Sequence, residues 1–181
     1  MEAVRAMGDV VIKPIFGSMG HGMVRVSDAD TAFRVVKALD AVRSVFYVQR
    51  VVEHGGRDVR AFVVGGRVLG AIERRAPEGA WRTNVSLGGV PRAFDLPPAW
   101  EVLALGAARA VGADYAGVDL LPAPDGTTYV LEVNGIPGWE GLQAATGLDV
   151  AGAIVDQLAA PALGVGGAAG APRNPAAAER A

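Results

Sequence analysis

Three oxygen-bearing side chains fall in two strand-like segments toward the end of the chain. Asp119 lies in an apolar run, and Glu132 and Asn134 lie two residues apart in the next one. Residues two apart on a strand share a face, and a hairpin can bring Asp119 to that face. Buried carboxylates need partners, and a hard divalent cation that also takes an amide oxygen satisfies them. The pattern indicates a magnesium site, and the alternative is a set of salt-bridged carboxylates on a solvated face.

A lysine and a glycine-rich loop form a second candidate site. Lys13 lies near the end of a short β-branched segment, and the loop after it contains Gly17, Ser18, Gly20 and Gly22. Glycines allow backbone N–H groups to close on phosphate oxygens, and the lysine adds a positive charge. The spacing is neither that of a P-loop nor that of a dinucleotide fingerprint, so by itself it is weak evidence for phosphate binding.

Basic side chains gather in a third segment, where Arg74 and Arg75 are followed by Arg82 and Asn84. Guanidinium forks match the paired oxygens of a carboxylate or phosphate. The alternative is an ordinary solvated loop. Asp58, at the start of a strand-like segment, is typical of a cap or turn unless a ribose hydroxyl needs an acceptor there.

Composition excludes several other classes of protein. Seventeen basic and nineteen acidic residues give the 181-residue chain a net charge of −2, which argues against a nucleic-acid or anionic-membrane surface. No cysteine is present, and His21 and His54 are isolated, so thiolate and histidine metal sites are not expected. No Gly-x-Ser-x-Gly elbow, signal peptide or spanning apolar run occurs, and we expect a cytoplasmic protein.

The elements that must position these groups alternate up to about residue 158. Gly65-Gly66 and Asp125-Gly126 predict two hairpin turns, so the class is α+β with largely antiparallel sheets. Residues 159–181 are rich in Ala, Gly and Pro and are predicted to be a disordered tail. The predicted strands are 9–14, 23–26, 46–52, 58–64, 67–73, 116–121 and 128–133, and the predicted helices are 28–42, 98–111 and 149–158.

Taken in order, these segments resemble the RimK-like ATP-grasp ligase family. The resemblance covers nearly all of residues 1–158 and implies a partial ATP-grasp fold of antiparallel sheets with flanking helices. It also implies that this region is the C-terminal part of that fold, because family members have a preceding domain and a further nucleotide-contacting lysine. The motifs that carry it are Val10-Val11-Ile12-Lys13-Pro14, Arg57-Asp58-Val59-Arg60, Glu73-Arg74-Arg75-Ala76, Trp81-Arg82-Thr83-Asn84, Gly117-Val118-Asp119, Leu131-Glu132-Val133-Asn134 and Pro137-Gly138-Trp139-Glu140-Gly141.

The resemblance also implies a role for each candidate residue. Nucleotide contacts are implied for Lys13 at the phosphates, for a lid containing Gly17, Ser18, Gly20 and Gly22, for an adenine hinge at Gln49, Arg50, Val51 and Val52, and for Asp58 at the ribose. Arg82 would face the transferred phosphate, with Arg74 and Asn84 completing the phosphate and substrate side, and Asp119, Glu132 and Asn134 would hold two Mg²⁺ ions, or Mn²⁺. The sequence departs from the family at Arg50, where the hinge usually has an acidic residue.

The implied reaction is ATP-dependent amide formation. A carboxylate attacks the γ-phosphate of ATP, and an amino acid, with glutamate expected, displaces phosphate from the acyl phosphate. The acceptor would be a small molecule or a protein C-terminal carboxylate. The segment Asn134-Gly135-Ile136-Pro137-Gly138-Trp139 also resembles ligases of pterin-cofactor (tetrahydromethanopterin) biosynthesis. A truncated, non-catalytic ATP-binding module and a structural domain are the alternatives, and a homo-oligomer is left open.

Overall fold

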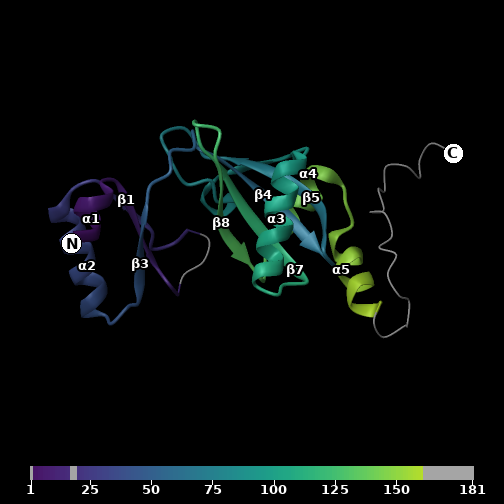
Figure 1. The fold of residues 1–181 in the computed structure, drawn as a ribbon, viewed down its shortest axis with the longest axis horizontal. Coiled ribbons are helices and arrows are strands. Elements are labelled where there is room, and N and C mark those ends of the chain that lie inside the picture. The colour runs from purple at the N-terminus through teal and green to yellow at the C-terminus, as the bar shows by residue number, and fades with distance from the viewer. Residues whose placement is uncertain (1, 17–19, 161–181) are drawn as a thin grey trace. The chain divides into compact units, whose positions relative to one another are not determined.

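The computed structural model describes residues 2–16 and 20–160 (Figure 1). The described residues form two compact units, which divide between Glu53 and His54 and are considered separately. The interpretation of residues 1–158 as one ATP-grasp domain stays a prediction. Gly17 and Ser18 of the predicted lid, and the predicted tail beyond residue 160, lie outside the described residues.

The first unit is a small sheet with helices on one face (Figure 1). Its three strands are antiparallel in the order β2-β1-β3. Val10 and Ile12 alternate toward the helices and are fully buried, packing with Val26 and Ala32. The unit consists of α1 (Glu2–Met7), β1 (Val10–Pro14), β2 (Val24–Val26), α2 (Ala29–Ala41) and β3 (Phe46–Arg50).

The second unit is built on a five-stranded antiparallel sheet in the order β6-β5-β4-β7-β8. Gly65 and Gly66 both have positive φ, 56° and 74°, and form the predicted hairpin turn between β4 and β5. The unit consists of β4 (Arg57–Val64), β5 (Arg67–Arg75), the 3₁₀ turn η1 (Val85–Leu87), β6 (Val90–Ala93), α3 (Pro98–Ala110), β7 (Tyr115–Pro122), β8 (Thr128–Asn134), α4 (Glu140–Thr146) and α5 (Val150–Ala159).

The central strand β4 divides its side chains between two faces of this sheet. Val59, Ala61 and Val63 pack into the cluster covered by α3. Phe62 and Val64 pack into the cluster that contains residues of α4 and α5 (Figure 1). Strand alternation places Asp58 and Arg60 on the same face as Phe62, but beyond its apolar cluster. One face of the sheet is therefore apolar at one end and charged at the other.

All ten predicted strands and helices are present, with ends shifted by a few residues. β3 ends at Arg50, so Val51 and Val52 lie outside it, and the Val51 N–H donates to the carbonyl of Asp9 at 3.0 Å. The sequence patterns did not predict α1, η1, β6 or α4. β6 is an edge strand that contains Pro91, a residue that disfavours strand prediction, and α4 buries only Leu142.

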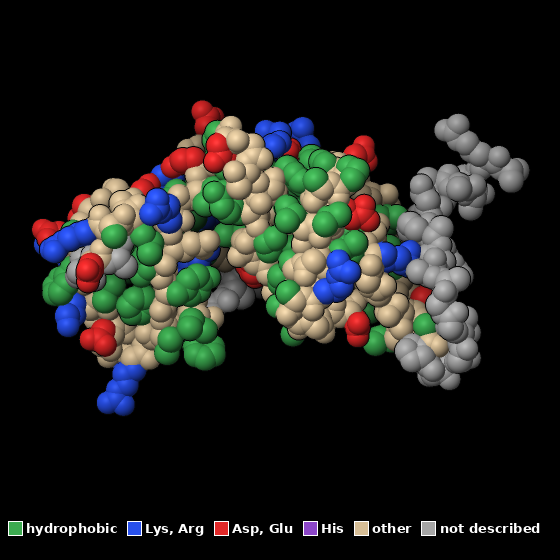
Figure 2. Space-filling model, in the orientation of Figure 1, with side chains coloured by type: hydrophobic (Ala, Val, Ile, Leu, Met, Phe, Trp, Pro, Cys, Tyr) green, Lys and Arg blue, Asp and Glu red, His purple; other side chains and the backbone are tan. Residues whose placement is uncertain are grey.

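Charged groups of both signs are interspersed over the face of the molecule shown in Figure 2. Neither unit presents a broad area of one charge there, which agrees with the near balance of 17 basic and 19 acidic residues. Within the described part of the chain, no helix combines the length and apolarity needed to cross a bilayer.

Candidate nucleotide and metal site

A row of alternating acidic and basic side chains crosses the charged end of the five-stranded sheet. Arg74 donates from Nε to Asp58 Oδ1 at 2.8 Å and also contacts Asp119, with Nη2 2.9 Å from Oδ2. Arg60 binds the same Asp119 through two bonds, Nε to Oδ1 at 2.7 Å and Nη2 to Oδ2 at 2.8 Å. Two carboxylates and two guanidinium groups thus form one continuous, charge-balanced network.

Strand register explains why these residues meet. Asp58 lies opposite Arg74 on β5, and Arg60 lies opposite Asp119 on β7. Asp119 in turn lies opposite Glu132 on β8. Because directly paired residues of antiparallel strands point to the same side, all five side chains belong to one face. The predicted hairpin and the shared face of Asp119 and Glu132 are confirmed.

Burial makes this network electrostatically strong. The side chains of Asp58, Arg74 and Asp119 are 5%, 4% and 6% exposed. Burial by itself would raise the pKa of Asp119, but the hydrogen bonds and charges of Arg60 and Arg74 outweigh it, so that pKa lies below its usual range. Burial would likewise lower the pKa of Arg74, but the carboxylates of Asp119 and Asp58 raise it above the ordinary arginine value. Asp119 and Arg74 therefore both stay charged at neutral pH.

Glu132 and Asn134 extend this face on the outer strand. Glu132 is exposed, and among the described residues no salt bridge involves it. The Asn134 side chain accepts from the Ile136 N–H at 2.9 Å. Together with Asp119 they offer carboxylate and amide oxygens, the donor set that magnesium prefers, and so the residues fit this ion. Among the described residues, no group of three or more His, Cys, Asp and Glu side chains could hold a metal ion.

The segment after Asn134 is packed tightly onto β7. A Cβ atom on Gly117 would lie only 2.7 Å from Pro137 Cβ, so no larger residue fits there without a shift. The Tyr115 hydroxyl donates to the Pro137 carbonyl at 2.9 Å. Both contacts fix the path of the chain as it leaves the candidate metal site.

Replacing Tyr115 with phenylalanine should lower the free energy of unfolding by about 1 kcal/mol at pH 8, because one hydrogen bond is lost. Burial and the charge of Glu140 raise the pKa of Tyr115 above its usual value. A raised pKa means that the stabilising bond is complete below about pH 10 and is lost as the pH rises through the folded-state value. Urea unfolding should therefore show wild type and variant converging above pH 10; a difference that stays constant up to pH 12 would contradict this role.

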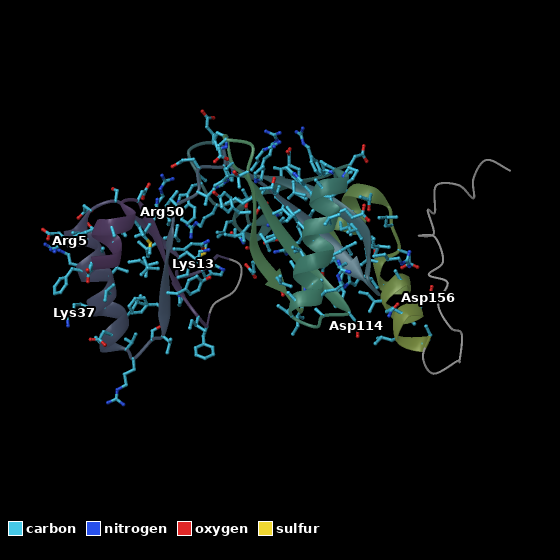
Figure 3. The ribbon with its side chains drawn as sticks, in the orientation of Figure 1. Arg5, Lys13, Lys37, Arg50, Asp114 and Asp156 are labelled. Carbon is cyan, nitrogen blue, oxygen red and sulfur yellow. The ribbon has the colours of Figure 1, made fainter. Side chains whose placement is uncertain are left out.

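In the first unit, two predicted nucleotide contacts are brought together. Lys13 donates from Nζ to Gln49 Oε1 at 2.6 Å, and its ammonium lies 5.7 Å from the centre of the Tyr47 ring. All three side chains lie on the sheet face opposite the helices, as the side chain of Lys13 shows in Figure 3. Arg50 pairs with Val10 and so belongs to the other face. The predicted hinge residues Gln49 and Arg50 therefore point to opposite sides.

Part of the predicted lid is also described. Gly20 and Gly22 both have a φ of 76°, which favours glycine, and a Cβ on Gly22 would lie 3.1 Å from the ring of Pro14. These two glycines thus serve the turn that joins β1 and β2, whatever further role the loop has.

The predicted basic group does not form one cluster. Arg74 is buried in the network, whereas Arg75 pairs with Glu73 at 2.6 Å on the other face of β5. Arg82 stacks over the Trp81 ring at 5.8 Å. The carbonyl of Asn84 accepts from the N–H groups of Leu87 and Gly89, which folds this segment into a compact turn.

Two members of the network, Arg60 and Thr83, were not assigned a role from the sequence. Thr83 is buried and its hydroxyl donates to Asp58 Oδ2 at 2.7 Å. Arg60 stands two residues after Asp58 on one strand, and period-two alternation alone places both on one face. Strand alternation could therefore have identified Arg60. The contact of Thr83 with Asp58 depends on the path of the segment between β5 and β6, for which the local sequence gives no signal.

Comparison of the whole arrangement with known structures leads to the ATP-grasp ligases. The structure of the ATP-grasp ligase PsnB in complex with a phosphomimetic variant of its minimal precursor, Mg and ADP matches with a TM-score of 0.65 and 25% identity, over 89% of this chain and 50% of that one. The fold is therefore the ATP-grasp fold. The model of the RimK-like ATP-grasp domain matches residues 1–158, and the chain belongs to that family.

Two similar proteins carry the names of glutamate ligases. A probable alpha-L-glutamate ligase of Trichodesmium erythraeum (strain IMS101) is 43% identical over 150 residues, which cover 82% of this chain and 50% of that protein. The tetrahydromethanopterin:alpha-L-glutamate ligase of Methanococcus maripaludis is 41% identical over 155 residues, covering 82% and 52%. The chain spans about half the length of these relatives.

Proposed function

We propose that this chain provides the ATP- and magnesium-binding part of a carboxylate–amine ligase that adds glutamate to an acceptor. The observation that carries the proposal is the pairing of Asp119 with Glu132 across β7 and β8, with Asn134 on the same face. The names of the relatives at 43% and 41% identity support glutamate as the added amino acid, and the PsnB complex with Mg and ADP supports the nucleotide and the ion.

In this proposal the chain positions groups and balances charge, and it supplies no covalent nucleophile. Asp119, Glu132 and Asn134 would hold two Mg²⁺ ions, or Mn²⁺, which neutralise the phosphate oxygens during transfer. Lys13 would bind a phosphate, and Arg82 and Asn84 would face the transferred group. Gly20 and Gly22 would belong to the lid, together with Gly17 and Ser18, while Gln49, Arg50 and Val51 would border the adenine.

Burial refines two of these assignments. The side chains of Asp58 and Arg74 are 5% and 4% exposed, and two hydrogen bonds join them, from Nε and Nη2 of Arg74 to the two carboxylate oxygens of Asp58. We therefore propose that Arg74 acts by positioning Asp58 and Asp119, and that Asp58 anchors the segment of Thr83 in addition to its predicted place at the ribose.

The reaction would take place in two steps. The acceptor carboxylate oxygen bonds to the γ-phosphorus as the bond to ADP breaks, which gives an acyl phosphate. The glutamate amine then bonds to the acyl carbon, and phosphate and a proton leave. The acceptor would be a small molecule or a protein C-terminus, and the Methanococcus relative favours testing a tetrahydromethanopterin-type pterin first.

The test is ADP release by the full chain with ATP, Mg²⁺, glutamate and a panel of carboxylates. The proposal predicts ADP release that requires both a carboxylate and Mg²⁺, and formation of a hydroxamate when hydroxylamine replaces glutamate, because hydroxylamine traps acyl phosphates. ATP binding without ADP release for any carboxylate would favour the alternative, a non-catalytic nucleotide-binding module. Release of ADP without any hydroxamate would contradict the acyl phosphate.

A further inference from the structure

Arg60 forms two hydrogen bonds with the carboxylate of Asp119, which the proposed function assigns to the metal. Its Nε and Nη2 atoms bind the two oxygens of Asp119 at 2.7 and 2.8 Å, and Arg74 Nη2 lies 2.9 Å from one of them. A carboxylate offers about four lone-pair positions. Three of these are directed at guanidinium nitrogens, so about one, on Oδ1, is left for another cation.

A divalent ion at that remaining position would lie close to the positive charge of Arg60. The Arg60 side chain is 14% exposed and that of Asp119 is 6% exposed, so water and salt screen the repulsion poorly. Full coordination by Asp119 therefore requires that a guanidinium group give up at least one of its bonds. Arg60 and the ion compete for the same oxygens.

Of the two arginines, Arg60 is the one that can withdraw. Arg74 is held from both sides, by Asp58 and by Asp119, and is 4% exposed. For Arg60 the bonds within the described residues go to Asp119 alone. Its stem runs beside Gly117, where a Cβ atom would lie 3.4 Å from Arg60 Cδ, so the missing side chain of Gly117 leaves the stem room.

We propose that Arg60 is a resident counter-cation of the metal site, which keeps the Asp119 carboxylate in place and yields it to an incoming divalent cation. Arg60 thereby sets the affinity of the site and holds it lower than the oxygen ligands alone would. This inference rests on the proposed function, because it takes Asp119 as a metal ligand. It gives Arg60 a positioning role that is separate from any contact with substrate.

The experiment is a titration of the full chain with Mn²⁺, without nucleotide, followed by electron paramagnetic resonance of the free ion. Arg60→Gln should bind Mn²⁺ about tenfold more tightly than wild type, within the range of roughly 5- to 150-fold common for coupled sites. Arg57→Gln is the matched control. Arg57 lies on the same strand and forms a comparable pair with Glu73 at 3.0 Å, but on the other face, and its removal should leave the affinity unchanged.

An Arg60→Gln protein that folds, as judged by circular dichroism, and binds Mn²⁺ no more tightly than wild type overturns the inference. If that variant is not recovered folded, Arg60→Lys replaces it as the test, because lysine lacks the planar fork that gives arginine two parallel bonds to one carboxylate. Its affinity should exceed that of wild type, and an equal or weaker affinity overturns the inference too. Asp119→Asn separates the two claims: if it binds Mn²⁺ as wild type does, the proposed metal site itself fails, whichever result the Arg60 variants give.

Discussion

Replacing Arg74 with methionine should lower the free energy of unfolding by about 3–5 kcal/mol, the cost typical of breaking a buried ion pair from one side. The guanidinium of Arg74 separates two buried carboxylates and binds both. Without it, Asp119 keeps Arg60, but within the described part of the chain the Asp58 carboxylate keeps only the hydrogen bond from the Thr83 hydroxyl. A buried carboxylate with one neutral donor is poorly compensated. Urea unfolding at pH 7 measures the change.

Arg75→Met is the control for this prediction, since it removes the same side chain from the next position of β5. Arg75 is 53% exposed and pairs with Glu73 on the other face, and exposed ion pairs contribute about 0–1 kcal/mol. The large effect should thus be confined to Arg74. Equal losses of stability in the two variants would show that the network does not stabilise this sheet.

Replacing Asp119 with asparagine should abolish divalent-ion binding and slow ADP formation by roughly 10²- to 10³-fold, because metal-held charge contributes several kcal/mol to such a step. The same change should lower the free energy of unfolding by about 1.5–3 kcal/mol, since asparagine keeps the shape but loses the charged hydrogen bonds to Arg60. Mn²⁺ binding, ADP release and urea unfolding, measured on the same preparation, give the three numbers.

A second variant shows whether a loss of stability alone could explain the loss of binding. Arg57→Gln breaks an ion pair with Glu73 on the opposite face and should destabilise the sheet without changing Mn²⁺ binding. A variant of Asp119 that is destabilised yet binds Mn²⁺ and releases ADP normally would assign this residue to the fold alone.

Strand alternation and turn residues predicted most of the fold. The Gly65-Gly66 turn, the runs on either side of it and the hairpin of Asp119 and Glu132 all have local signals, because both faces of these strands repeat every second residue. β6 and α4 were not predicted, because the contacts that hold them are made with strands of the large sheet and not within the segments themselves. In particular, the pairing of β6 with β5 has no signal within its four residues, one of which is Pro91.

The candidate site could be predicted as a set of residues, but not as a set of partners. Spacing along β8 places Glu132 and Asn134 on one face, yet nothing local shows that Asp119 accepts from Arg60, which is 59 positions away. The burial of Arg74 likewise depends on β4 lying between β5 and β7. For this reason Arg74, which was expected at the phosphate, is found between two carboxylates, and Arg60, which had no assigned role, is found beside the proposed metal ligand Asp119.

Glu132 offers the most direct test of the proposed metal site, because it is exposed and takes part in no ion pair within the described residues. Its replacement with glutamine should leave the fold intact, so any change in binding reports on the site. The measurement is calorimetric titration of wild type and Glu132→Gln with ATP, with and without Mg²⁺. We expect Mg²⁺-dependent binding that is weakened at least about tenfold in the variant, a loss of 1.4 kcal/mol. Identical titrations of the two proteins in Mg²⁺ would contradict the proposed site.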